Sequence, residues 1–172
     1  MSGLPARVIQ VLKDYLPAEL ALIDAEEADG ITTPAIANDH YHEWAPEVIF
    51  EPPACAIRIV SSEPVATWPD GFGRHVDAIH RLEAIFICTH QDSNQESLDL
   101  QKIMARYIAG ALRVLTVMYE GLQTSADPTR VVTEVRWEDA ATYGPEGDQV
   151  DDNGAVVRTA TLPIAIRQVE SR

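Results

Sequence analysis

The segment from His75 to His90 constrains the fold more than any other part of the sequence. In its second half the side chains alternate between two faces, with Leu82, Ala84, Phe86 and Cys88 on one and Arg81, Glu83, Ile85 and Ile87 on the other. Alternation with a period of two is the pattern of a β-strand. Because Ile85 and Ile87 make the second face apolar as well, we expect a long strand that is buried on both sides near its end.

An amphipathic helix is predicted at the start of the chain. Apolar residues recur there every three or four positions among charged ones, at Val8, Leu12, Leu16, Leu20 and Ile23, and the pattern ends by Gly30. Pro17 lacks the N–H that an interior helical residue donates, so we expect either a kink at this position or two short helices.

The longest helix is predicted in the middle of the chain. It begins at Asp92 or Ser93, either of which can accept hydrogen bonds from the first turn, and it ends at about Met118. Its apolar face is formed by Leu100, Met104, Tyr107, Ala111 and Leu115. Gly110 disfavours a helix relative to Ala and therefore indicates close packing against a neighbouring element.

Three further strands are predicted from short apolar or alternating segments, which are Ala54 to Ser62, Thr129 to Trp137 and Val156 to Val169. The Asn153-Gly154 turn favours an antiparallel return of the last strand, with Leu162, Ile164 and Ile166 pointing inward. Pro163 is expected to restrict that strand to an edge or a bulge. We interpret 63–74 and 144–154 as loops, and the proline-rich segment 31–53 as an extended arm with a contact role.

These elements predict one domain over residues 1–172, in the order helix, arm, strand, strand, long helix, strand, strand. Hairpin-type connections favour a mainly antiparallel sheet of about four strands. The fold class is therefore α+β, with the N-terminal helix and the long central helix packed on one face of the sheet.

Charge narrows the possible partners. The chain has 13 Lys and Arg against 27 Asp and Glu, a formal net charge of -14, which disfavours tight binding to nucleic acid or anionic membranes. The two cysteines, Cys55 and Cys88, lie within apolar runs and are expected to be buried and reduced. The start of the sequence lacks the pattern of a signal peptide, and no apolar run is long enough for a membrane span, so we expect a soluble protein that is not exported.

The sequence contains few motifs for chemistry. His40 and His42 within Asp39 to Glu43 have the spacing of possible metal ligands if the segment is extended, and the alternative is a solvated or interfacial loop. His75 and Asp77 share one face of their strand while His80 lies on the other, without an accompanying nucleophile motif. Phosphate-binding and nucleophile-elbow motifs are missing from the sequence. We therefore expect no enzymatic activity, no cofactor and no metal.

Aromatic residues in turn-rich segments indicate contacts with a partner. Trp68 and Phe72 lie in the loop between the first two strands, and Trp44 lies in the arm. Such residues are too apolar for loops exposed to solvent, and aromatic side chains are enriched at interfaces. The sequence therefore predicts that a partner surface covers them.

As a whole the chain resembles the small tail terminator or tail completion proteins of tailed bacteriophages. The resemblance is carried by LPARVIQVLKDYLPAELALIDAEEADGI, by the arm with Tyr41, Trp44 and Pro46, by PPACAIRIVSSEP, by GRHVDAIHRLEAIFICTHQD and by VRTATLPIAIRQVE. It covers nearly the whole chain in element order but includes no invariant chemical motif. The arm and the acidic loop are long for a minimal member.

The resemblance implies a non-enzymatic virion protein that is assembled in the host cytoplasm. It would form a homomeric, commonly hexameric ring that caps the tail tube, joins it to the head connector or stopper protein, and lets genomic DNA pass without tight binding. Trp44, Trp68, Phe72 and Arg74 are then candidate contacts with other subunits or with the tail tube protein. Candidate acidic residues for the lumen or rim are Asp24, Glu26, Glu27, Asp29, Glu146, Asp148, Asp151 and Asp152.

Two other interpretations stay open at this point. Head completion and stopper proteins of the phage neck share this size and acidity. A small ligand-binding or enzymatic domain with a site built from His40 to Glu43 belongs to a different class.

Overall fold

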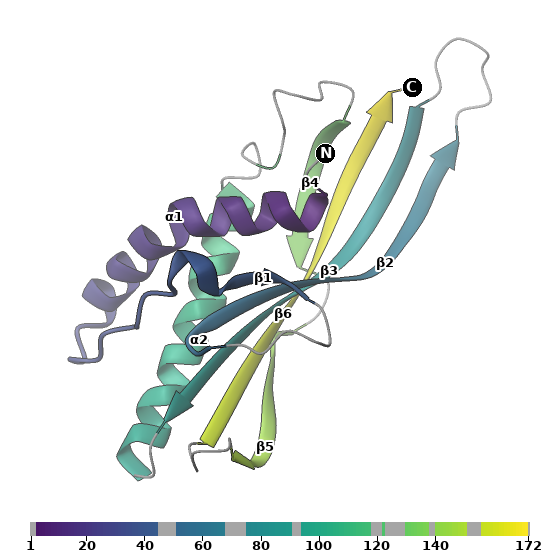
Figure 1. Cartoon of the computed structure of the whole chain (residues 1–172). Helices are drawn as coiled ribbons and strands as arrows, with labels where there is room; N and C mark the ends of the chain where they lie inside the picture. The colour runs from purple at the N-terminus through teal and green to yellow at the C-terminus, as the bar shows by residue number, and fades with distance from the viewer. Residues whose placement is uncertain are drawn as a thin grey trace.

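The computed structural model describes residues 3–44, 51–67, 75–90, 94–117, 122, 130–137, 140–150 and 156–171. Within these residues the chain forms helices and strands in the order α1 (Leu4–Glu27), η1 (Asn38–His40), β1 (Tyr41–Glu43), β2 (Ala54–Thr67), β3 (His75–His90), α2 (Asn94–Val117), β4 (Arg130–Trp137), β5 (Thr142–Val150) and β6 (Val156–Ser171). The α+β class is confirmed, and Figure 1 shows the two long helices beside a strongly elongated sheet.

Among the described residues the sheet has six strands, in the order β1-β2-β3-β6-β4, and β5 also pairs with β6. Its pairs are antiparallel except that β1 runs parallel to β2. The prediction of about four mainly antiparallel strands is therefore wrong in strand number, and the sheet is mixed. The two strands that were not predicted are short or polar segments, whose pairing depends on backbone hydrogen bonds and not on an apolar face.

Each unpredicted strand lies in a segment interpreted as irregular. Strand β1 lies inside the proline-rich arm and is only three residues long. Strand β5, with the sequence TYGPEGDQV, occupies much of the expected acidic loop at 144–154. Its register on β6 shifts between Gly144 and Gln149, so a regular alternation of side chains could not have identified it.

Both helices cover the same face of the sheet. The main core joins α1 and α2 to one set of alternating strand residues, among them Ile57 of β2, Phe86 of β3 and Leu162 of β6. Phe86 lies parallel to the ring of Tyr107 from α2, with ring centroids 5.3 Å apart. Gly110 lets the helices approach closely, because a Cβ there would lie 2.9 Å from Leu16 Cδ1 and 3.1 Å from Leu20 Cδ2. The close packing inferred from this glycine is confirmed.

The structure decides two expectations about prolines. Helix α1 continues through Pro17 as one helix, so of the two alternatives for this position, a kink or two short helices, the second is wrong. Pro163 lies in β6, which has β3 on one side and β4 and β5 on the other, so it is not in an edge strand. It falls between Ile164, which pairs with β4, and Thr161, which pairs with β5. Neither β4 nor β5 pairs with Pro163 itself, so a residue without an N–H is tolerated where one neighbouring strand ends and the other begins.

The other face of the sheet is apolar only in part. Ala54, Ile85 and Ile87 form a second buried cluster with the partly buried Val157, which confirms that the end of β3 is buried on both sides. Farther along, Arg58 of β2 and Glu83 of β3 form an ion pair, and so do Asp77 of β3 and Arg167 of β6. We call Ala54–Ile57, Leu82–Cys88 and Ala160–Ile166 the proximal half of the sheet, and Arg58–Thr67, His75–Arg81 and Arg167–Ser171 the distal half. In Figure 1 the distal half extends past the helices at the upper right.

Candidate assembly interface

The acidic run at the end of α1 is tied to α2 by a largely buried ion cluster. Arg106 has a side chain only 5% exposed, and it donates from one nitrogen to Asp24 Oδ1 at 2.8 Å and to the Ile31 carbonyl at 2.8 Å. Its other terminal nitrogen donates to Asp29 Oδ1 at 2.6 Å. Thr33 completes the cluster by donating its N–H and hydroxyl to Asp24, each at 2.7 Å. The cluster therefore fixes the first residues of the arm to both helices.

These contacts change the acidity of the two aspartates. The hydrogen bonds from Arg106 and the Ile31 N–H hold the pKa of Asp29 far below its usual range. Burial alone would raise the pKa of Asp24, but hydrogen bonds from Thr33 and Arg106 outweigh it and the pKa is lowered. Both carboxyls are ionised and bound within the molecule. Because Arg106 already binds both carboxylates, Asp24 and Asp29 are poor candidates for a lumen or rim.

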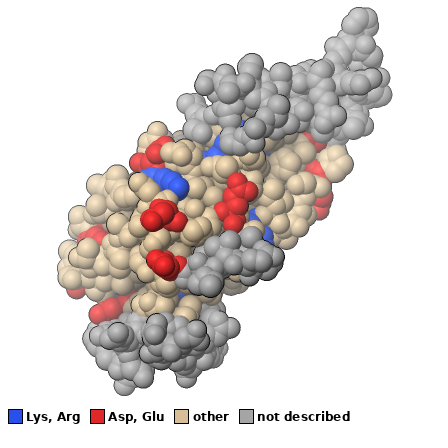
Figure 2. Space-filling view, in the orientation of Figure 1, with Lys and Arg blue, Asp and Glu red and all other residues tan. Residues whose placement is uncertain are grey.

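The other acidic candidates have different surroundings. Glu26 pairs with Arg113 at 2.9 Å but is 58% exposed, and Glu27 is exposed. Glu146 and Asp148 lie on β5, and their side chains lie outside the described residues, as do Asp151 and Asp152 entirely. On the face shown in Figure 2, acidic groups are scattered with a few basic groups between them. Glu26 and Glu27 therefore stay candidates for a lumen or rim.

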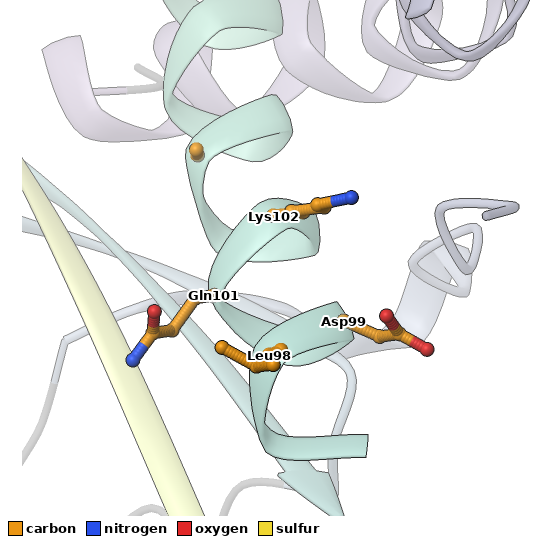
Figure 3. A pocket seen from close by; sticks show the side chains of 5 residues that line it. Leu98, Asp99, Gln101 and Lys102 are labelled. Atoms are coloured by element: carbon orange, nitrogen blue, oxygen red, sulfur yellow. The ribbon is translucent and has the colours of Figure 1, made fainter. Parts of the chain in front are cut away.

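Two shallow hollows border helix α2. One, of about 370 Å³, lies beside the Arg106 cluster and is lined by Ile23, Glu27, Asp29, Lys102, Ala105, Arg106, Ala109 and Arg113. The other, of about 350 Å³, is lined by Leu98, Asp99, Gln101, Lys102 and Ala105. Figure 3 shows Lys102 and Asp99 pointing to one side of the helix and Gln101 to the other. Polar groups that diverge in this way do not form a site for a small substrate, which needs groups that converge.

The histidines of the arm are not arranged as paired metal ligands. His40 lies in the η1 turn and not in an extended strand, while His42 lies on β1, so the condition under which the two would have metal-ligand spacing, an extended segment, is not met. The His40 ring is within hydrogen-bond distance of the Pro53 carbonyl, Nδ1 to O 3.2 Å, and its Nε2 lies 3.6 Å from Glu51 Oε2. In the part of the chain that the structure describes, no group of three or more potential ligands comes together.

The other titratable groups singled out in the sequence have structural partners. Asp77 accepts hydrogen bonds from Arg167, which lower its pKa. His80 Nδ1 lies 2.8 Å from Ser62 Oγ, across the β2–β3 pair. The His75 side chain lies outside the described residues. Cys55 and Cys88 are buried as expected, and burial raises the pKa of the Cys88 thiol to about 12 and that of Cys55 even further.

Of the four candidate contact residues, the structure describes only Trp44. It is 37% exposed at the end of β1, where its N–H donates to the Ile57 carbonyl at 2.8 Å. The guanidinium of Arg58 lies 5.7 Å from the centre of the Trp44 ring. Trp68, Phe72 and Arg74 lie outside the described residues.

The structure adds contact candidates that sequence reasoning missed. On β2, Ile59, Val60 and Val65 are 47%, 55% and 48% exposed. On the outer strands β4 and β5, Trp137 and Tyr143 are 59% and 52% exposed. One feature of the sequence could have indicated that this strand continues. From Ile59 to Thr67 the apolar alternation stops, but residues with β-branched side chains, which favour strands, continue. It was interpreted as a strand end and a loop, yet β2 continues through it.

Comparison with known proteins adds no family assignment. No protein-family model matches the chain, and no curated protein matches it. Among the described residues, no helix is long and apolar enough to cross a membrane.

Proposed function

We propose that this chain is a structural subunit of a phage neck, of the tail terminator type. Copies would form a ring, hexameric in the proposal, that caps the tail tube protein and joins it to the head connector or stopper protein. The chain would carry out no reaction and would hold no cofactor. Its place of action would be the virion, after assembly in the host cytoplasm.

The observation that carries this proposal is the distal half of the sheet. Every side chain from Arg58 to Val65 is exposed or half-buried, although the backbone is in a regular strand. Figure 1 shows this end of the sheet beyond the helix layer. A sheet that extends past its own core presents strand surface to a neighbour, which suits a subunit that is placed side by side with others.

The internal polar contacts also support a structural role. Arg106 binds the end of α1 and the arm to α2, and Arg7 of α1 donates to the Leu122 carbonyl at 2.6 Å and to Gln168 Oε1 of β6 at 3.1 Å. Each contact joins elements that are far apart in the sequence. Buried arginines of this kind hold a subunit in one shape, which repeated assembly requires.

A direct test combines assembly with genetic context. The purified chain should bind one end of tubes polymerised from the tail tube protein encoded nearby, and negative-stain images should show rings at that end. The flanking genes should encode a portal, a major capsid and a tail tube protein. Binding to the head connector alone would instead identify a head completion or stopper protein, and binding to neither would contradict the proposal.

The charge of the ring gives a second test. Six copies would together carry 6 × -14 = -84, so phosphates passing through would be repelled and not retained. We expect no measurable binding of duplex DNA at moderate ionic strength. A sub-micromolar affinity that weakens steeply with added salt would contradict the passage of DNA without tight binding.

A further inference from the structure

The outer edge of β2 is paired along only a part of its length. Strand β1 pairs with β2 from Cys55 to Ile57, and the N–H of Trp44 closes this contact on the Ile57 carbonyl. From Arg58 to Thr67, β2 pairs with β3 on one side, while no strand among the described residues pairs with it on the other. An open edge presents backbone N–H and C=O groups that another strand can bind.

Apolar side chains accompany this open edge. Ile59, Val60 and Val65 each expose about half of their surface within a stretch of seven residues. All three are β-branched, and such side chains pack well against a neighbouring strand. The edge therefore offers both backbone groups and apolar surface to a partner.

The charge at the edge selects the partner. Along β2 and the facing part of β3, the two arginines among the described residues are each paired with a carboxylate on the neighbouring strand, Arg58 with Glu83 and Arg81 with Glu63, the latter at 2.7 Å. This part of the surface is thus locally neutral on a chain of net charge -14. A second copy of so acidic a protein meets the least repulsion where the charges are already balanced.

The edge also limits how far pairing can extend. The register of β2 on β3 shifts between Ile59 and Ser61 and again between Pro64 and Ala66, and Pro64 has no N–H to donate. Bulges and prolines are features that prevent open-ended pairing of exposed edges. Only a short run around Ser61 to Glu63 lies between the two irregularities, so a strand partner would be held over a defined and short length.

We propose that the distal edge of β2, from Arg58 to Thr67, is a contact surface for a second copy of this chain. The contact consists of a short strand pairing around Ser61 to Glu63, flanked by packing against Ile59, Val60 and Val65. This inference rests on the proposed ring, for which it names one of the two surfaces that a head-to-tail contact requires.

The test compares two substitutions with equal exposure. Val60→Lys places a charge on the edge, whereas Leu22→Lys does so on α1, where Leu22 is 57% exposed against 55% for Val60. Circular dichroism should show both variants folded, since neither side chain is buried. By sedimentation velocity over a range of concentrations, we expect Val60→Lys to weaken self-association at least tenfold and Leu22→Lys to change it less than twofold.

Cross-linking gives a second readout. A Ser61→Cys variant labelled with a maleimide–benzophenone and irradiated should form covalent dimers, because the photo-activated group reacts with whatever surface of the neighbouring copy faces the edge. The label goes to the new thiol, since Cys55 and Cys88 are buried with raised pKa values. The matched Leu22→Cys variant should not form dimers.

The outcomes separate this inference from the proposed function. If rings form on tail tubes and Val60→Lys does not weaken them, or if both lysine variants weaken them equally, the edge is not the contact, while the ring proposal stands. If the unmodified chain does not associate and the labelled Ser61→Cys variant does not cross-link, with or without tubes, the edge proposal is overturned. The neck assignment is then decided by the tube-binding test alone.

Discussion

The proximal and distal halves of the sheet are built from the same strands but are stabilised differently. In the proximal half, Ile57, Phe86 and Leu162 are at most 1% exposed and pack against both helices. In the distal half, exposed cross-strand ion pairs such as Glu63 with Arg81 take the place of apolar packing along β2. Burial of apolar surface contributes far more stability than exposed ion pairs do. The proximal half therefore holds the fold, which leaves the distal half free to contact other molecules.

The largest expected effect of a substitution lies in the proximal half. Phe86→Ala removes a fully buried ring that stacks on Tyr107, and we expect the free energy of unfolding to fall by about 3–5 kcal/mol. Val65→Ala in the distal half should lower it by less than about 0.5 kcal/mol, because Val65 is 48% exposed. Urea denaturation of both variants measures the contrast, and similar losses would show that the two halves do not differ in this way.

The second prediction concerns the cluster that joins the helices to the arm. Arg106→Met leaves the Asp24 carboxylate, which is 17% exposed, without its cation, and should lower the free energy of unfolding by about 1–3 kcal/mol at neutral pH. The pH dependence follows from the two carboxyls, whose pKa values are lower in the folded chain than in the unfolded one.

Their contribution is complete above the unfolded pKa of about 4 and is lost as pH falls through the lower folded values. The difference between the original chain and Arg106→Met should therefore shrink as pH is lowered below about 4. Denaturation curves at several pH values measure it. A penalty that does not change with pH would mean that packing of the arginine, and not its charge, stabilises the cluster.

The third prediction tests how closely the two helices approach. Gly110→Leu places a side chain where even a Cβ would lie 2.9 Å from the buried Leu16. Overpacking of this kind should lower the free energy of unfolding by about 1–3 kcal/mol despite the better helix propensity of leucine. Ala105→Leu, at an exposed position of the same helix, is the control and should change stability little. An unchanged or raised stability of Gly110→Leu would show that the helices can separate at no cost.

The smallest expected effect lies at the distal surface. Glu63→Gln removes the carboxylate that pairs with Arg81, but Glu63 is 60% exposed, so the loss in unfolding free energy should stay below about 0.5 kcal/mol. Asp77→Asn is the matched change at a buried carboxylate that accepts from Arg167, and should cost about 1–3 kcal/mol. Equal losses in unfolding free energy for the two variants would mean that the contribution of a carboxylate in the distal half does not depend on its burial.

The elements that follow from local periodicity were predictable from the sequence. The strand from His75 to His90 has the predicted bounds, and the long helix begins and ends within two residues of the prediction. The inward set Leu82 to Cys88 is buried as the alternation indicated. Such patterns are visible because a side chain and its neighbours two, three or four positions away share one environment.

The candidate site was less predictable. Trp44 is on the described surface as expected, but Asp24 and Asp29 face Arg106, and the open edge of β2 was interpreted partly as a loop. The buried arginines Arg7 and Arg106 lie among apolar residues in the sequence, and nothing near them in the chain indicates the groups that accept their hydrogen bonds. Those acceptors come from Gln168 and Leu122 for Arg7, and from α1 and the arm for Arg106.

By itself, the sequence determined the α+β class, the positions of the helices and longest strands, and the faces that are buried. Only the tertiary structure decided that β1 and β5 join the sheet, that Pro163 is accommodated between the partners of a central strand, and that β2 extends past the core with one edge open. The physical reason is the separation along the chain between the groups that interact. Side-chain burial leaves a periodic record in neighbouring residues, whereas strand pairing and ion pairing depend on backbone and polar groups brought together from distant parts of the chain.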